Sequence, residues 1–358
     1  MIYLDYQATT PLAPEAREAM LRWLGGPDSD TFGNPHSPHR MGRMAAAAVE
    51  VAREQVAGLF PPGGRVIFTY GATEAINLAI RGGPNGPAAC STIEHAAVRD
   101  TARWYGAEHD LQVGPDGLLD PAVPIPSDAR LIAVMQVNNE IGTIQPVEAI
   151  AARIRAHGAL LLCDAVQGAG KLAPPASADM IAVSAHKLHG PKGIGALWVR
   201  EGLELSPVTH GGGQEQGLRS GTLSPALCAG FGVAARIAVQ RREEDVAQVE
   251  TLWNRARELF AGWTVNGSAE HRWHGNLNIR RDGLDVARLM SDCRQVMFSA
   301  GSACASGSGR PSHVLKAIGL SDAQAKSSIR LGFGRYTTAE DLDTAAAAIK
   351  AAAKEQGL

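Results

Sequence analysis

The sequence predicts an α/β protein built on a mostly parallel β-sheet, and three observations lead to that class. Short apolar runs alternate with helical patterns through the middle of the 358-residue chain, which is the order of βα units. Several runs are apolar at every position, as in strands that are covered on both faces. The chain is 45% hydrophobic and 20% charged, which is ordinary for a globular protein and excludes a disordered or fibrous one.

The predicted strands define the sheet. Apolar runs predict them at 65–70, 88–91, 131–137, 159–163, 181–184 and 195–199. Between them, apolar periodicity predicts helices such as Thr73 to Arg81 and Val147 to His157. Gly158 directly follows the second helix, where glycine commonly ends a helix with left-handed backbone.

The pattern changes after about residue 240. A charged helix is predicted from Arg241 to Phe260, and the segment after it is less regularly βα. The last helix opens on Thr338 and Asp341, the spacing of a capping box. We expect a second, smaller domain from about residue 250, packed closely because no repeat or low-complexity linker separates it.

Charge and composition limit the partners. The formal net charge is −2, so no positive field favours nucleic acid or an anionic membrane. The N-terminal residues lack a basic and apolar leader, and no long uninterrupted apolar span follows. We therefore expect a cytoplasmic protein whose partners are small molecules and other proteins.

Two charged residues follow predicted strands. Lys187 comes after the strand at 181–184, and Asp164 ends the strand at 159–163, with Gln167 three residues on. Taken singly, the lysine fits a solvated surface position and the aspartate fits a helix cap. Together they suit a cofactor that needs an amine for its aldehyde and a carboxylate for its pyridinium nitrogen.

A phosphate site is predicted where the first strand runs through Gly71, Ala72 and Thr73 into a helix. The free N–H groups and the dipole at a helix N-terminus favour an anion. An ordinary βα turn with Thr73 as N-cap is the alternative. Ser184 and His186, beside Lys187, could add donors to the same phosphate.

The five cysteines contain no CxxC pair, which fits neither a disulfide framework nor a structural zinc site. Cys304 stands apart because glycine, serine and alanine surround it, as in a loop that presents a thiol. Cys90, Cys163, Cys228 and Cys293 lie in apolar or helical contexts, where cysteine behaves as a small buried hydrophobe.

With these residues in view, the chain resembles the cysteine desulfurases, an iron–sulfur-cluster-type group with a Gly-Ser-Ala-Cys motif within the class V aminotransferases. The matching segments follow the family order along most of the chain. They are 3–6 with 8–10, 32–35, 71–74, 94–95, 137–142, Asp164 with Gln167, 186–187, 219–222, 301–304 and 327–330.

The resemblance implies a fold-type I enzyme that uses pyridoxal 5'-phosphate. Lys187 would join the cofactor's aldehyde, Asp164 its ring nitrogen and Gln167 its ring hydroxyl, while His95 would stack on the ring and move protons. Ala72, Thr73, Ser184 and His186 would bind the phosphate, and Asn139 would line the cofactor site. Asn34, Asn139 and Arg330 would hold the substrate carboxylate, Arg330 through a bidentate pair. No metal is implied.

The family also implies a homodimer, in which Thr222 reaches the phosphate of the neighbouring subunit. It implies a large cofactor-binding domain over residues 12–250 and a small domain made of 1–11 and 251–358, which carries Cys304 and Arg330. The expected activity converts L-cysteine to L-alanine and leaves a persulfide on Cys304 for a sulfur-acceptor protein. Lys187 would act as the base, and the Cys304 thiolate as the nucleophile.

Two alternatives remain at this stage. A selenocysteine lyase, or another class V lyase or transaminase, would use Lys187 without a nucleophilic cysteine. A non-catalytic scaffold would keep the fold alone. Alanine release from cysteine, selenocysteine and cysteine sulfinate separates the first group, and cofactor absorbance tests the second.

Overall fold

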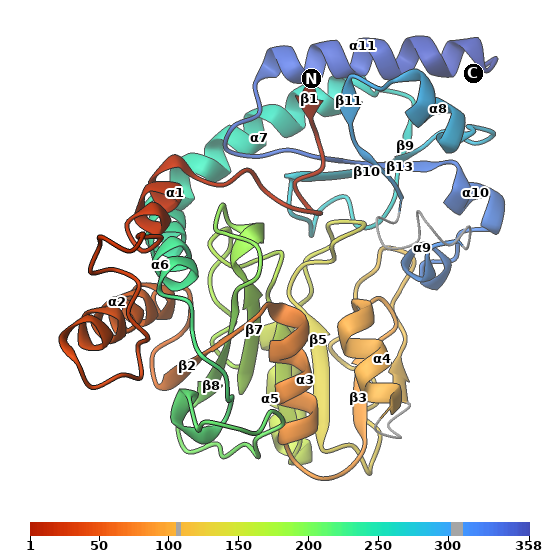
Figure 1. Cartoon of the computed structure of the whole chain (residues 1–358). Helices are drawn as coiled ribbons and strands as arrows, with labels where there is room; N and C mark the ends of the chain where they lie inside the picture. Colours follow the sequence, from red (N-terminus) through yellow and green to blue (C-terminus); the bar gives the residue numbers. More distant parts are fainter. Residues whose placement is uncertain (105–108, 302–310) are drawn as a thin grey trace.

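The central feature of the computed structural model is a seven-stranded sheet (Figure 1). The structure describes residues 1–104, 109–301 and 311–358. Within them, the strands follow the spatial order β2-β8-β7-β6-β5-β3-β4. Their bounds are β2 Gly64–Thr69, β3 Ala88–Ser91, β4 His109–Leu111, β5 Leu131–Met135, β6 Leu160–Asp164, β7 Met180–Ser184 and β8 Gly195–Arg200.

The sheet is mostly parallel, as predicted, with one reversed strand. The neighbouring pairs from β7 to β4 are parallel, whereas β8 runs antiparallel to both β2 and β7. The carboxyl ends of β5, β6 and β7 therefore meet at one edge, where open α/β sheets bind ligands.

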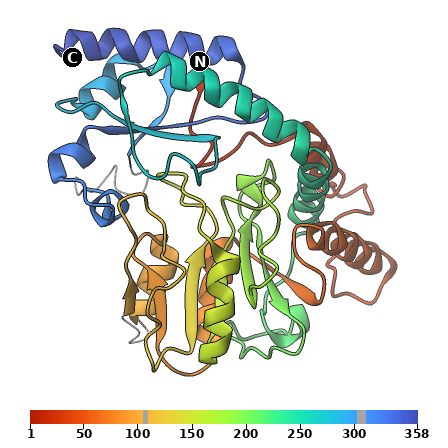
Figure 2. The ribbon, with the colours of Figure 1, turned by 180° about the vertical axis from the view of Figure 1, so that it is seen from behind.

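Helices cover both faces of this sheet (Figures 1 and 2). On one face lie α3 (Ala72–Gly82) and α4 (Ala96–Trp104), packed on apolar residues such as Leu162. The other face is covered by α2 (Arg40–Ala57), α5 (Val147–His157) and α6 (Pro225–Gln240), packed on residues such as Leu161 and Cys163. Neighbouring residues of β6 thus enter opposite cores, which explains why the strand is apolar throughout.

A second group of elements packs around its own apolar core. It contains a four-stranded sheet in the order β12-β13-β10-β9 and the parallel pair β1-β11. Leu4 lies in this core with residues between Leu252 and Ala353. The bounds are β1 Ile2–Tyr3, α7 Arg242–Leu259, β9 Thr264–Val265, β10 Asn276–Arg280, α8 Val286–Asp292, β11 Val296–Met297, β12 Ser299–Ala300, β13 Ser328–Gly332 and α11 Ala339–Glu355.

The remaining elements are short. They are α1 (Pro14–Leu21), α9 (His313–Ala317), α10 (Asp322–Lys326) and the 3-10 turns η1 (Ala185–Lys187) and η2 (Glu215–Gly217). Across the described ranges, no helix combines the length and apolar character needed to cross a membrane.

Helix-end predictions agree closely with the structure. Helix α5 has the predicted bounds and ends at Gly158, whose φ of 81° is left-handed. Helix α11 begins with a complete capping box between Thr338 and Asp341. Gly71 occupies the N-cap of α3, so the alternative of an ordinary turn with Thr73 as N-cap is wrong. The short strand β4 was not predicted.

Candidate active site

A cavity of about 520 Å³ opens at the carboxyl ends of β5, β6 and β7. A volume of this order suits a cofactor together with a small substrate. Most of the predicted site residues line it, although they come from segments far apart in the sequence. These residues are Ala72, Thr73, His95, Asn139, Asp164, Gln167, Ser184, His186, Lys187 and Arg330.

Lys187 projects from η1 rather than from a strand end, because β7 stops at Ser184 and the chain turns. Its Nζ donates to the carbonyl oxygens of Gln7 at 2.6 Å and Ala8 at 2.9 Å. The half-buried amine is thus held at the cavity by the N-terminal segment.

Asp164 is buried at the end of β6 and lines the cavity. Its Oδ1 accepts a hydrogen bond from the Val166 backbone N–H at 3.0 Å. Burial raises the pKa of this carboxyl, and the positive charges of His95 and Lys187 oppose that shift. A cation beside Asp164 would stabilise its ionised form.

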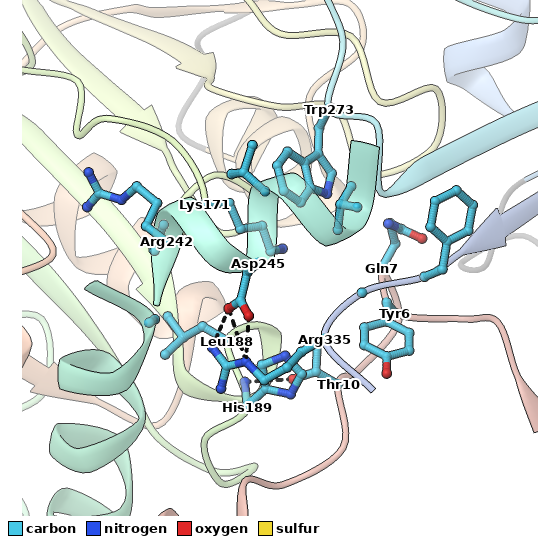
Figure 3. Close-up of a pocket in the computed structure, with 17 residues that line it drawn as sticks. Tyr6, Gln7, Thr10, Lys171, Leu188, His189, Arg242, Asp245, Trp273 and Arg335 are labelled. Carbon is cyan, nitrogen blue, oxygen red and sulfur yellow. Dashed lines mark hydrogen bonds and ion pairs between the residues drawn. The ribbon is translucent and has the colours of Figure 1, made fainter. Parts of the chain in front are cut away.

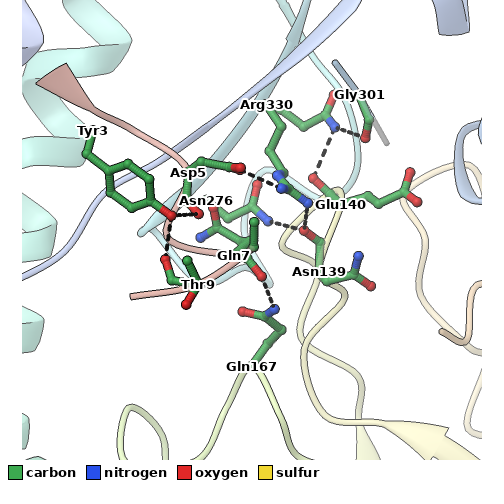
Figure 4. Close-up of polar contacts among 12 residues, drawn as sticks. Tyr3, Asp5, Gln7, Thr9, Asn139, Glu140, Gln167, Asn276, Gly301 and Arg330 are labelled. Carbon is green, nitrogen blue, oxygen red and sulfur yellow. Dashed lines mark hydrogen bonds and ion pairs between the residues drawn. The ribbon is translucent and has the colours of Figure 1, made fainter. Parts of the chain in front are cut away.

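Gln167 lies close to the same N-terminal segment (Figure 4). Its Nε2 donates to the Gln7 carbonyl oxygen at 2.9 Å. Its Oε1 is buried and has no hydrogen-bond partner among the described residues. Because a buried acceptor without a donor costs free energy, this atom suits a ligand that carries a hydroxyl group.

The predicted phosphate cradle is formed by the turn between β2 and α3. Ala72 and Thr73 begin the helix, so their N–H groups belong to its unpaired first turn. Ser184 lies next to this turn: its Oγ is 3.8 Å from the position that a Cβ on Gly71 would occupy. His186 lines the cavity, and its Nδ1 lies 3.1 Å from the Thr9 hydroxyl.

Arg330 is 1% exposed and lies on β13 at the cavity wall. Figure 4 shows its ion pair with Asp5, at 2.7 Å from Nη2, and its 2.9 Å hydrogen bond from Nη1 to the Asn139 carbonyl. Its Nε has no hydrogen-bond partner within the described part of the chain. That donor is suited to an incoming carboxylate.

Two of the predicted site residues that the structure describes, Asn34 and Thr222, do not line this cavity. Asn34 is exposed, and its Oδ1 accepts from the His36 backbone N–H at 2.9 Å; the side chain is used in a local turn rather than at the cavity. Thr222 is exposed and does not line the cavity of its own chain. Cys304 lies outside the described residues.

The other cysteines are buried and unpaired with one another, as predicted. Burial raises the pKa of the Cys90 and Cys228 thiols to about 12. Burial raises the pKa of Cys163 well above its ordinary value and also raises the pKa of Cys293. Since the thiolate is the nucleophile, these four positions are poor sites for sulfur chemistry.

Gln7 and Asp5, which hold Lys187 and Arg330, were not predicted as site residues. Asp5 belongs to the matching segment 3–6, so a signal for it was present, whereas Gln7 lies between the matching segments 3–6 and 8–10. However, the segment contacts the site largely through backbone carbonyl groups, and the direction of a carbonyl group cannot be predicted from a sequence pattern.

The chain is similar in sequence to a known protein family. Residues 2–344 match the family model described as aminotransferase class-V. A curated cysteine desulfurase IscS from Shewanella denitrificans is 42% identical over 96% of this chain and 90% of its own length. The chain belongs to the class V aminotransferases, as a cysteine desulfurase.

Solved structures agree with this assignment of the desulfurase. A NifS-like protein is 29% identical, with a TM-score of 0.89 and coverage of 99% of both chains. A structure described as SspA in complex with cysteine is 34% identical, with a TM-score of 0.80 over 94% of this chain and 100% of that chain. The fold is therefore that of the fold-type I enzymes, and the family implies pyridoxal phosphate as cofactor, cysteine as substrate and a protein as sulfur acceptor.

Proposed function

We propose that this desulfurase converts L-cysteine to L-alanine with pyridoxal 5'-phosphate held in the described cavity, and that the sulfur leaves as a persulfide on Cys304. The observation that carries the proposal is the meeting of Lys187, Asp164 and the α3 N-terminus around one cavity of about 520 Å³. An amine, a buried carboxylate and an anion cradle match the aldehyde, ring nitrogen and phosphate of that cofactor.

The residues around the cavity fit the cofactor group by group. We assign Lys187 to the aldehyde, Asp164 to the ring nitrogen, Gln167 to the ring hydroxyl and His95 to the ring face, all of which line the cavity. Ala72, Thr73, Ser184 and His186 are assigned to the phosphate. When bound, the cofactor supplies an electron sink for charge that develops on the substrate.

Asp164 has a defined electrostatic task in this arrangement. Its pKa is raised by burial, and a protonated ring nitrogen would supply the positive charge that favours its ionised form.

Lys187 has a different task. Held by the Gln7 and Ala8 carbonyls, it would take the proton from the substrate Cα as a general base when it is neutral.

Arg330 and Asn139 are assigned to the substrate carboxylate. Arg330 uses Nη1 and Nη2 within the protein, and Nε is left without a partner in the described residues. The Asp5 carboxylate compensates the buried guanidinium before substrate binds. We also assign Asn34 to the substrate carboxylate. Its side chain is exposed, so it would have to turn toward the cavity to make this contact.

Sulfur transfer is assigned to Cys304, which lies outside the described residues. Its thiolate would form an S–S bond with the substrate sulfur while the substrate C–S bond breaks. The electron pair of that bond stays with the three-carbon fragment, which takes up protons and leaves as alanine. The persulfide sulfur then passes to an acceptor protein.

We further propose that the enzyme is a cytoplasmic homodimer with two closely packed domains, 12–250 and 1–11 with 251–358. Four buried cysteines without disulfides suit a reducing compartment. The exposed Thr222 is available to a second subunit, in line with the role expected at the neighbour's phosphate.

The test is Cys304→Ser mixed with cysteine. A serine hydroxyl is hardly ionised near neutral pH, whereas a thiol of ordinary pKa is a few per cent thiolate. We expect the cofactor spectrum still to change with substrate, while alanine and protein-bound persulfide are absent. Mass spectrometry locates the persulfide in the wild-type enzyme.

The matched controls are Cys90→Ser, Cys163→Ser, Cys228→Ser and Cys293→Ser, which alter thiols that are buried. Each should keep the persulfide on Cys304. Persulfide that still forms on another cysteine at the wild-type rate in Cys304→Ser would refute the assignment. The same assay with selenocysteine and cysteine sulfinate measures substrate preference.

A further inference from the structure

An ion pair between Arg219 and Glu74 lies beside the proposed phosphate cradle, and no step of the mechanism above uses it. Arg219 Nε donates to Glu74 Oε1 at 2.8 Å, and Nη2 donates to Oε2 at 3.2 Å. The two side chains are 4% and 19% exposed. The guanidinium also lies over the Tyr70 ring, 4.2 Å from its centre. Lysine could not reproduce this bidentate, stacked arrangement.

Glu74 occupies the first turn of α3, the helix whose N-terminus lines the cavity. It fixes the turn before the helix, because its Oε2 accepts from the Tyr70 backbone N–H at 2.5 Å. Its negative charge, however, lies within one helical turn of the N–H groups assigned to the phosphate. A carboxylate there competes with a phosphate group, which carries close to two negative charges near neutral pH.

Arg219 removes that conflict by neutralising Glu74. The Glu74 interactions raise the pKa of the Arg219 guanidinium against the opposing effect of burial, so the positive charge is retained. Arg219 also orders the segment that leads to Thr222, since its Nη1 contacts the Gly221 carbonyl at 3.5 Å. Gly221 is in turn held by the Gln214 side chain at 2.8 Å.

We propose that Arg219 is a positioning residue of the phosphate subsite, which cancels the charge of Glu74 and so allows the α3 N-terminus to bind the cofactor phosphate. The proposal rests on the proposed function, because it assumes that pyridoxal phosphate occupies the cavity. The proposal depends on the sign of the charge beside the phosphate. Removal of the Arg219 charge and removal of the Glu74 charge should therefore change phosphate binding in opposite directions.

The experiment measures the dissociation constants of pyridoxal phosphate and of pyridoxal, which lacks the phosphate, by absorbance titration of the apoenzyme. Their ratio is the phosphate preference. Arg219→Met should lower this preference by about 10- to 100-fold, because the Glu74 carboxylate is then uncompensated beside the phosphate. Glu74→Gln keeps an acceptor for Tyr70 N–H and leaves Arg219 positive, so the preference should be equal to or above that of the wild type.

The double variant Arg219→Met with Glu74→Gln should return toward the wild-type preference, because both charges are gone. Arg335→Met is the matched control. The Arg335–Asp245 pair, shown in Figure 3, is 5% and 20% exposed with contacts of 2.6 to 3.1 Å. It does not line the cofactor cavity. Its loss should lower stability without changing the phosphate preference.

A wild-type phosphate preference in Arg219→Met would overturn the inference. So would an equal fall in Arg219→Met and Glu74→Gln, because a purely structural ion pair loses the same geometry from either side. The proposed function fails separately, if the wild-type chain binds neither form of the cofactor. Thermal unfolding of each variant identifies any that does not fold. If Arg219→Met does not fold, Glu74→Gln still tests whether the Glu74 charge opposes phosphate binding.

Discussion

The position of Lys187 is fixed by contacts that the sequence alone does not show. A lysine after a predicted strand also fits a solvated surface position, which is the usual one. In the structure its Nζ contacts two carbonyl oxygens of the N-terminal segment, at 2.6 and 2.9 Å. Those acceptors come from residues 180 and 179 positions away. The amine is therefore fixed at the cavity by tertiary contacts, and its role can be tested by removal.

Lys187→Ala should abolish turnover while the protein stays folded, because the side chain lies at a cavity wall rather than within a core. Loss of general-base assistance alone lowers the rate by about 10²- to 10⁴-fold. Alanine release measures turnover, and thermal unfolding measures stability. Lys354→Ala, which alters an exposed lysine of α11 that does not line the cavity, is the control and should retain turnover. Alanine release near the wild-type rate in Lys187→Ala would remove this residue from the site.

At the scale of elements, the close contact between β8 and the phosphate turn positions the cradle. A Cβ on Gly195 would lie 2.7 Å from Gly71 Cα and 2.5 Å from the Val183 carbonyl oxygen. Only a residue without a side chain permits this approach. The neighbouring strands were predicted from apolar runs, but the antiparallel direction of β8 was not, because a doubly covered strand is apolar in either direction.

Gly195→Ala should push the turn at Gly71 away from β8 and weaken cofactor binding. Overpacking of this kind typically costs about 1–3 kcal/mol of folding free energy. Thermal unfolding and a pyridoxal phosphate titration measure the two effects. Gly26→Ala is the matched control, because a Cβ there would meet no atom within 4 Å. Unchanged cofactor affinity in Gly195→Ala would show that the turn tolerates the displacement.

The whole molecule assembles the cavity from segments that are distant in the chain. Residue 7, the turn at 71–73, the strand ends at 164 and 184, and Arg330 all line it. The first strand packs with β11, and Leu4 enters the core formed by residues from Leu252 onward. The boundary proposed at residue 250 stays a prediction, and α7 (Arg242–Leu259) runs across it.

The proposed homodimer is tested by Thr222→Ala. If the exposed hydroxyl contacts the phosphate of the neighbouring subunit, its loss should weaken cofactor binding by roughly 1 kcal/mol. Dialysis followed by absorbance measures retained cofactor, and sedimentation measures the oligomeric state. Ser224→Ala, in which the hydroxyl caps α6 of its own chain, is the control. A monomer that keeps full cofactor occupancy would contradict both the contact and the dimer.

The α/β class and the order of the main strands and helices could be predicted from the sequence, and the resemblance to family motifs implied most of the residues around the cavity. These depend on local periodicity, caps and short motifs, which a linear chain records directly. The sequence also singled out Cys304 by its small neighbours, a prediction that the described residues leave untested.

The pairing of charges around the site could not be predicted and is visible only in the folded chain. Asp5 contacts Arg330 across 325 positions of the chain, and Glu74 contacts Arg219 across 145. The tertiary structure also separated Asn34, whose side chain serves a local turn, from the residues that line the cavity. The physical reason is that such pairs depend on which strand ends become neighbours, and no periodicity within either segment carries that information.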